Sequence, residues 1–108
     1  MKIDQTAGQL DMLLLAALAQ GPAHGYGVIA RLRDDSGGIF AMPEGTIYPA
    51  LHRLEASGFV SSSDEFVGRK RRRTYRLTDA GVERLDTRRA EWTAFSTLVS
   101  RMIGVQPA

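Results

Sequence analysis

A proline inside a helical pattern sets the tightest constraint on how this chain folds. Apolar residues recur three and four apart in the stretch TIYPALHRLEASGFV (residues 46–60), as on one face of an α-helix: Ile47, Ala50, Leu51 and Leu54. Gly58 ends that pattern, as a glycine after a helix C-terminus does. Pro49 lies within the pattern, and a proline in a helix interior costs about 3 kcal/mol. We therefore expect the N-cap at Gly45 or Thr46, which would leave Pro49 in the first turn, where it costs little.

Two more helices are predicted at the two ends of the chain. The first covers residues 7–19, where Thr6 and Gln9 have the spacing of a capping box. The last covers residues 79–103, with the Thr78 hydroxyl as its N-cap. The first helix is apolar around much of its surface, so we expect it to be buried on more than one side.

A second helix is predicted over residues 25–35, with Arg31 and Arg33 pointing away from its apolar face. The glycines of the segment DDSGG end it. Three apolar residues in the segment that follows predict a short buried connector: Ile39, Phe40 and Met42.

The apolar period changes after residue 58. The segment FVSSSDEFVGRKRRRTYRLT (residues 59–78) predicts two strands joined by a turn near residues 64–68. The chain is then mainly α with a small β-hairpin, in the order of a winged helix-turn-helix followed by a long C-terminal dimerisation helix. In that architecture the third helix enters the major groove of DNA and the hairpin lies against the phosphate backbone. We expect residues 1–78 to form the winged-helix domain and residues 79–108 to form the dimerisation helix and tail.

Positive charge is concentrated in one short run. The formal net charge is +2, yet six of the 14 Lys and Arg residues lie within residues 69–76. A charge run is often only a solvated surface, but on the predicted hairpin it indicates phosphate contact. The predicted DNA contacts come from the second helix, the third helix and the hairpin: His24, Tyr26, Glu44, Gly45, Thr46, Tyr48, Pro49, His52, Arg53, Arg69, Lys70, Arg71, Arg72 and Arg73. Structural capping is an equal alternative for His24 and Tyr26, and packing is an alternative for Tyr48.

The last helix carries an apolar seam that nothing else in the sequence covers. Leu85, Trp92 and Val99 are spaced by seven, with further apolar residues beside them. The same helix of a second copy would cover this seam, so we predict a homodimer. The predicted interface joins the first and last helices: Leu10, Leu13, Leu14, Leu85, Trp92, Phe95, Val99, Met102 and Ile103.

Several kinds of protein are disfavoured by the composition. There is no cysteine, which removes disulfides, thiolate catalysis and cysteine-based metal sites. Two histidines without a carboxylate cluster do not make a metal site, and no nucleophile pairs with Glu44 or Glu55, so we expect no cofactor and no enzyme. The absence of a signal peptide or an apolar run long enough for a membrane span leads us to expect a cytoplasmic protein.

Three stretches together carry a resemblance to a known family. HGYGVIARL (residues 24–32), EGTIYPALHRLEASGFV (residues 44–60) and GRKRRRTYRLTDAG (residues 68–81) closely resemble the PadR family of bacterial transcription regulators. The resemblance implies a homodimeric winged-helix DNA-binding protein, usually a repressor, that dimerises through its first and last helices. The single C-terminal helix corresponds to the short type of this family. The hairpin is more basic than the usual family pattern, and Thr74 stands where an aromatic residue is common, which leaves the packing of the hairpin open.

Some members of the family bind flat aromatic molecules in a pore at the dimer interface, between tryptophans of the two last helices. The resemblance places Trp92 at that position, although a role in the dimer core alone is an equal alternative. The leading hypothesis is therefore a repressor that binds a pseudo-palindromic operator and responds to a planar aromatic effector. Its alternatives are a regulator without an effector and a winged-helix adaptor that binds protein instead of DNA.

Overall fold

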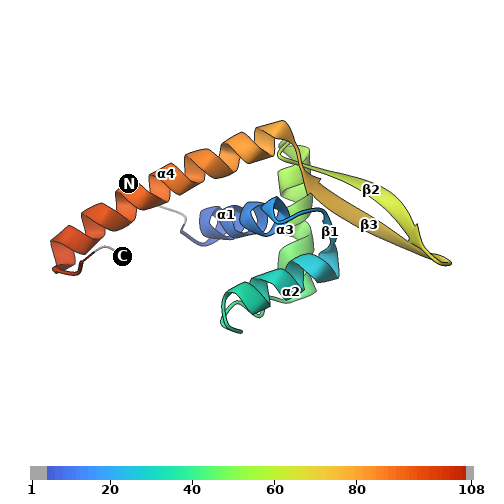
Figure 1. The fold of residues 1–108 in the computed structure, drawn as a ribbon, viewed down its shortest axis with the longest axis horizontal. Helices are drawn as coiled ribbons and strands as arrows, with labels where there is room; N and C mark the ends of the chain where they lie inside the picture. Colours follow the sequence, from blue (N-terminus) through green and yellow to red (C-terminus); the bar gives the residue numbers. More distant parts are fainter. Residues whose placement is uncertain (1–4, 107–108) are drawn as a thin grey trace.

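The computed structural model describes the backbone of residues 5–106 and the side chains of residues 8–106. The described elements follow in this order: α1 (Gln5–Ala19), β1 (Ala23–His24), α2 (Gly25–Asp35), α3 (Glu44–Ala56), β2 (Val60–Val67), β3 (Lys70–Leu77) and α4 (Asp79–Ile103). Figure 1 shows α1, α2 and α3 gathered together, while the β2–β3 hairpin and α4 extend from them in opposite directions. The Cα trace consequently spans 56 Å along its longest axis and at most 29 Å across it.

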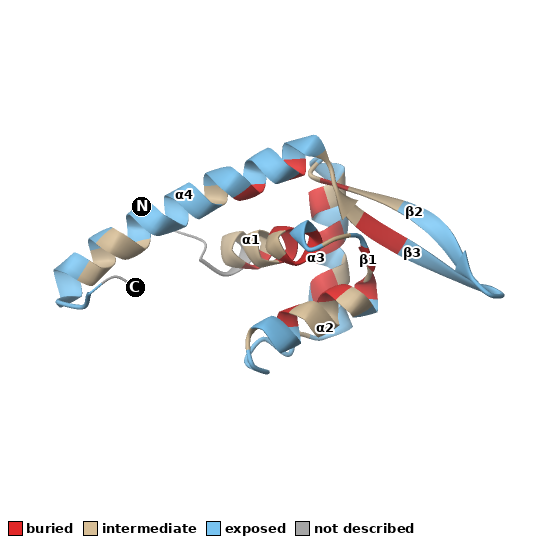
Figure 2. Cartoon of the chain, in the orientation of Figure 1, coloured by how far each residue is buried: buried red, intermediate tan, exposed pale blue. Residues whose placement is uncertain are grey.

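The hydrophobic core lies where α1, α2 and α3 meet the base of the sheet. Leu14 and Leu15 of α1 pack there with Ile47 and Leu51 of α3, all essentially inaccessible to solvent, and Tyr75 closes the core from β3. Figure 2 shows that burial fades along the hairpin and along most of α4. The expectation that α1 is buried on more than one side is confirmed, since α1 contacts α2, α3, α4 and β3.

Helix α3 begins earlier than predicted. Its N-cap is Pro43, so Pro49 is the sixth helical residue and lies in the second turn, not the first. Our prediction of an N-cap at Gly45 or Thr46 is therefore wrong. Pro49 has no N–H to donate to the carbonyl of Gly45, but both residues are exposed, so water can bind that carbonyl.

The C-terminus of α3 is closed as predicted. Gly58 has φ +83°, its N–H donates to the Glu55 carbonyl, and the N–H of Phe59 donates to the Leu54 carbonyl. This is a Schellman motif, which requires a residue in the left-handed region just past the helix. The chain thereby reverses from α3 into β2 at a defined residue.

The predicted start of the first helix is not the observed one. We expected Thr6 to cap a helix over residues 7–19, but α1 already includes Thr6, so Thr6 is not its N-cap. The predicted bounds of α2 and α4, in contrast, agree with the structure.

Two predictions around α2 are wrong. Arg31 does not point away: its Nη1 atom donates to the carbonyl of Ala17 in the last turn of α1 (3.0 Å) and to that of Gly21 just beyond the helix (2.6 Å). The Ala17 carbonyl also accepts from the Gln20 N–H (3.3 Å), so the guanidinium adds a second donor at the end of α1 and supplies one to the Gly21 carbonyl. The connector after α2 is also not buried as a whole, because Ile39 is 82% exposed and Phe40 is 39% exposed. Glycines end α2 just before these residues, and the chain then runs across the surface.

The sheet has three strands among the described residues, in the order β1-β3-β2, and all pairs are antiparallel. Sequence reasoning missed β1, which is two residues long. The turn also lies later than predicted, at Gly68 and Arg69, since Val67 pairs with Lys70. Gly68 has φ +65° and Arg69 does not have positive φ, the sign pattern of a type II′ hairpin turn with glycine in first place.

The start of α4 is tied to the end of α3 by one residue. The Thr78 side chain accepts from the Gly81 N–H (3.1 Å) and donates to the Gly58 carbonyl (2.6 Å), while the Thr78 N–H donates to the Phe59 carbonyl (3.2 Å). The predicted N-cap is confirmed, and the direction of α4 is thereby set by the same turn that ends α3.

Candidate nucleic-acid interface

Helix α3 presents a strip of small and polar residues to solvent. Its apolar face is taken up by the core, so the residues on the opposite side are exposed. Gly45, Thr46, Pro49 and His52 all lie on this exposed part of the helix. Hydroxyl and imidazole groups can donate to and accept from base edges, and Gly45 lets a backbone approach closely. Among the predicted contacts, these four form one continuous surface.

Tyr26 and Tyr48 form a pair beside this strip, at the start of α2 and α3. Their rings are 6.4 Å apart in an edge-to-face arrangement. Tyr26 is 62% exposed and its hydroxyl hydrogen-bonds Glu44, which raises the pKa of the Tyr26 phenol. Tyr48 is half-buried, and burial raises the pKa of its phenol. The structure therefore gives Tyr48 a packing role while leaving part of its ring accessible.

His24 has a structural role in addition to its exposure. It is the N-cap of α2, where its Nδ1 atom accepts from the Gly27 N–H at 3.1 Å. Its Nε2 atom lies 3.2 Å from Nη1 of Arg72. A neutral imidazole has one accepting nitrogen, so Gly27 and Arg72 cannot both donate to it. Since Nδ1 caps the helix, the Arg72 guanidinium keeps its donors for another acceptor, such as a phosphate.

The hairpin carries six of the 14 basic residues, but acidic residues lie opposite them. Asp64 and Glu65 on β2 face the basic run on β3, a juxtaposition that depends on strand register. Asp64 pairs with Arg71 (3.2 Å) and with Arg73 (3.4 Å), and Glu65 pairs with Arg76 (3.1 Å). Residues 60–77 still hold six basic and two acidic side chains, so the hairpin remains positive while the rest of the chain is net negative.

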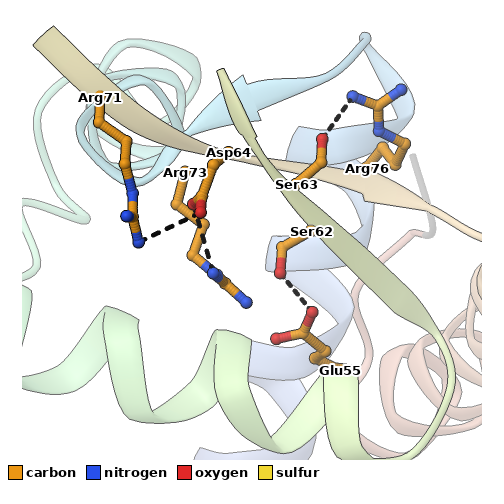
Figure 3. Close-up of polar contacts among 7 residues, drawn as sticks. All are labelled: Glu55, Ser62, Ser63, Asp64, Arg71, Arg73 and Arg76. Carbon is orange, nitrogen blue, oxygen red and sulfur yellow. Dashed lines mark hydrogen bonds and ion pairs between the residues drawn. The ribbon is translucent and has the colours of Figure 1, made fainter. Parts of the chain in front are cut away.

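Figure 3 shows how these side chains divide between the two faces of the hairpin. Arg71, Arg73 and Asp64 lie on the side toward α3, where Ser62 also hydrogen-bonds Glu55 of that helix. Arg76 lies on the other side, beside Ser63. Arg71 and Arg73, which lie on the α3 side of the hairpin, are thus the two arginines that pair with Asp64.

Arg53 forms an ion pair with α1. Its Nη2 atom lies 2.5 Å from a carboxylate oxygen of Asp11 on α1. Arg53 therefore links α3 to α1, whereas Arg69, Lys70 and Arg72 are exposed on the hairpin. An ion pair at this partly exposed position contributes at most about 1 kcal/mol, so phosphate can still compete for Arg53.

The residues predicted for the dimer interface divide between positions buried in the protomer and positions exposed on α4. Leu10, Leu14 and Leu85 are buried within the protomer, so they build its own core and offer little surface to a second copy. Trp92 is 46% exposed, Leu98 55% and Met102 76%. Sequence reasoning missed Leu98, although the spacing of three and four from Phe95 through Leu98 to Met102 was a signal for it.

No group of three or more His, Cys, Asp or Glu side chains that could hold a metal ion is present in the described part of the chain. Nor does any helix over those residues have the length and apolar character needed to cross a membrane.

The three-helix cluster, the hairpin and the exposed strip of α3 define a winged helix-turn-helix fold. The profile of the transcriptional regulator PadR-like family matches residues 14–87. The chain therefore belongs to the PadR-like family of transcriptional regulators.

Solved structures support this assignment. A transcriptional regulator from Clostridium thermocellum is 27% identical and superposes with a TM-score of 0.82, covering 92% of this chain and 97% of that one. A PadR family regulator from Eggerthella lenta is 32% identical with a TM-score of 0.80, covering 92% of this chain and 85% of that one. These proteins share both the winged-helix core and the long last helix.

Curated relatives match over shorter lengths. A transcriptional regulator of Mycobacterium tuberculosis is 48% identical over 42 residues, which are 39% of each protein. A protein of a Streptomyces fradiae transposon is 43% identical over 76 residues, 70% of this chain and 21% of that protein. The chain thus spans well under half the length of these relatives.

Proposed function

We propose that this PadR-like regulator binds DNA sequence-specifically as a homodimer and represses transcription from a pseudo-palindromic operator. The proposal rests on one observation: Arg71 and Arg73 lie on the side of the hairpin that is turned toward α3, the helix that carries the exposed strip. Helix α3 would read base edges in the major groove, and the hairpin would bind phosphates. Two copies would then read half-sites about 34–36 Å apart.

The exposed apolar stripe of α4 supports the homodimer. Phe95, Leu98 and Met102 lie on one side of a helix that extends well beyond the protomer's own core. A second α4 would remove this surface from water. We expect Leu98→Glu to convert a dimer into monomers in sedimentation, while Thr93→Glu, on the opposite side of α4, leaves the dimer intact. A monomeric wild type would contradict the homodimer.

A planar aromatic effector is the finer part of the proposal. Trp92 is half-exposed and its ring lies 6.2 Å from that of Phe95, so two α4 helices would bring four such rings to one interface. Such rings favour stacked planar ligands. Because Trp92 is the one tryptophan in the sequence, its fluorescence reports binding directly. Quenching by flat aromatic compounds, with none by saturated analogues, is the expected result. Equal responses to both would favour a regulator without such an effector.

DNA binding is tested by a mobility shift with the duplex upstream of the protein's own gene, at two salt concentrations. Wild type should shift this duplex specifically and less strongly at high salt, and Arg71→Ala/Arg72→Ala should weaken the shift further. Equal binding by the double variant and wild type would remove the hairpin from the interface. Failure of wild type to bind any duplex at either salt would instead favour the protein–protein adaptor.

A further inference from the structure

A pocket of about 240 Å³ lies where α1, the end of α3 and the start of α4 come together (Figure 1). No residue of the exposed strip of α3 lines it, so it is separate from the surface proposed to read DNA bases. Met12, Leu54 and Phe59 form its apolar wall, and charged side chains form much of the rest. An apolar wall with a few converging polar groups is the usual form of a small-molecule site.

The charged part of this pocket is strongly positive. Three guanidinium groups and one carboxylate line it: Arg53, Arg84, Arg88 and Asp11. Asp11 pairs with Arg53, so the carboxylate of the lining is already engaged. The lining therefore carries an excess of two positive charges, contributed by the two arginines of α4.

Arg84 and Arg88 lie one turn apart on α4, a spacing at which like charges destabilise a helix. Arg88 donates to the Gly8 carbonyl (3.0 Å) and reaches Glu91 (3.3 Å), which lies outside the lining. Within the described part of the chain Arg84 makes no hydrogen bond and no ion pair, and its guanidinium lies 5.8 Å from the centre of the Phe59 ring. An anion held by both arginines would relieve their repulsion and supply the acceptor that Arg84 lacks.

We propose that this pocket binds a phosphate monoester with a small organic group. Arg84 and Arg88 would hold the phosphoryl oxygens, and Met12 and Phe59 would contact the organic group. A phosphate monoester carries about −1.5 to −2 charges at pH 7, which matches the excess of two positive charges, whereas a carboxylate would balance only one. Guanidinium groups also fit the geometry of phosphate oxygens. This inference goes beyond the proposed function, because it assigns a second ligand at a site that neither DNA nor the exposed apolar stripe of α4 uses.

The test is isothermal titration calorimetry of the full chain with phenyl phosphate, inorganic phosphate and benzoate at one ionic strength. Wild type should bind phenyl phosphate more tightly than either of the other two, since phenyl phosphate alone has both the double charge and the apolar group. Arg84→Gln should weaken that binding at least about tenfold, as loss of a hydrogen bond to a charged group does. Asp11→Asn should tighten it, because the Arg53 guanidinium is then free to bind the ligand.

Arg89→Gln is the matched control, because Arg89 lies outside the lining and pairs with Asp86. It should bind phenyl phosphate as wild type does. Urea unfolding midpoints verify that each variant is folded. Arg88→Gln provides a second variant of the pocket, and it should also weaken the binding.

Three results would overturn the proposal. Equal affinity of wild type for phenyl phosphate and inorganic phosphate would mean an adventitious ion only. Equal losses in Arg84→Gln and Arg89→Gln would mean that the positive charge of α4 attracts anions without a site. No binding of phenyl phosphate, together with weaker duplex binding by Arg84→Gln, would assign these arginines to the DNA interface instead. The calorimetry uses no DNA, so failure of the proposed DNA binding would leave this inference standing.

Discussion

The ring of Tyr48 occupies the space that a side chain at position 25 would need. A Cβ atom on Gly25 would stand 2.3 Å from the Tyr48 hydroxyl and 2.5 Å from a ring carbon. Gly25 begins α2 and Tyr48 lies in α3, so this contact sets how closely the two helices of the helix-turn-helix approach each other. The close approach is possible only because position 25 carries no side chain.

Replacing Gly25 by alanine should therefore destabilise the protein by about 1–3 kcal/mol, as overpacking of a filled site does. Urea unfolding measures the loss. In Gly25→Ala/Tyr48→Ala the clash no longer exists, so the double variant should lose less than the two single losses together. Additive losses would mean that Tyr48 swings aside at no cost.

Arg31→Ala should lower the free energy of unfolding by about 1.5–3 kcal/mol, since hydrogen bonds from a charged group to part-buried carbonyls are lost. Arg31→Lys should not restore the full stability, because one ammonium cannot reproduce the contacts of the guanidinium with Ala17 and Gly21. Arg33→Ala is the matched control, two residues along the same helix and exposed, and should change stability by less than about 0.5 kcal/mol. Equal losses at the two positions would contradict a stabilising role for the hydrogen bonds of Arg31 to the end of α1.

Asp64→Asn should strengthen DNA binding and make it more sensitive to salt. The variant frees Arg71 and Arg73 from a carboxylate that competes with phosphate, and each extra phosphate neutralised adds about 0.9 to the salt slope. Fluorescence anisotropy with a labelled duplex across salt concentrations measures both quantities. Asp86→Asn is the control, because Asp86 pairs with Arg89 on α4, away from the hairpin. Weaker binding by Asp64→Asn would show that the carboxylate orients the two arginines instead of competing for them.

The folded protein should lose stability in alkali through Tyr75. Burial raises the pKa of the Tyr75 phenol above its value of about 10 in the unfolded chain. A raised pKa means that the folded state holds its proton longer, so the related stability is complete below pH 10 and is lost as pH rises through the folded pKa. Above pH 10, the free energy of unfolding of Tyr75→Phe, measured with urea, should therefore fall less steeply with pH than that of wild type. If the two free energies of unfolding fell in parallel with pH, the loss of stability in alkali would not come from Tyr75.

Features that depend on neighbours in sequence were predictable. The bounds of α2 and α4 follow from glycines and from the Thr78 hydroxyl, which act within one turn of helix. The start of α3 was not predictable in this way, because Pro49 is tolerated in the second turn when the carbonyl it leaves unpaired faces water. The general rule against interior prolines misplaced the N-cap by two to three residues.

Features that depend on residues far apart in sequence were missed. Nothing within the run of arginines indicates that Asp64 lies opposite Arg73, since that pairing follows from a two-residue turn at Gly68 and Arg69 that the sequence did not locate. The contact of Arg31 with the end of α1 likewise requires the two helices to be packed first. The same holds for Leu85, whose seven-residue spacing with Trp92 concealed that α1 covers one end of α4 and leaves the other bare.

The hydrogen bonds of Thr78 make a single stiff joint between the helix that would read DNA and the helix that would hold the second copy. In the proposed dimer, no loose linker separates these two tasks. A small change in the crossing angle of the paired α4 helices would then move each α3 over a large distance, because α4 is long and is joined rigidly to α3. A ligand wedged between the long helices could change the reach of the dimer without touching either DNA-reading surface, and the operator spacing that it tolerates would record that angle.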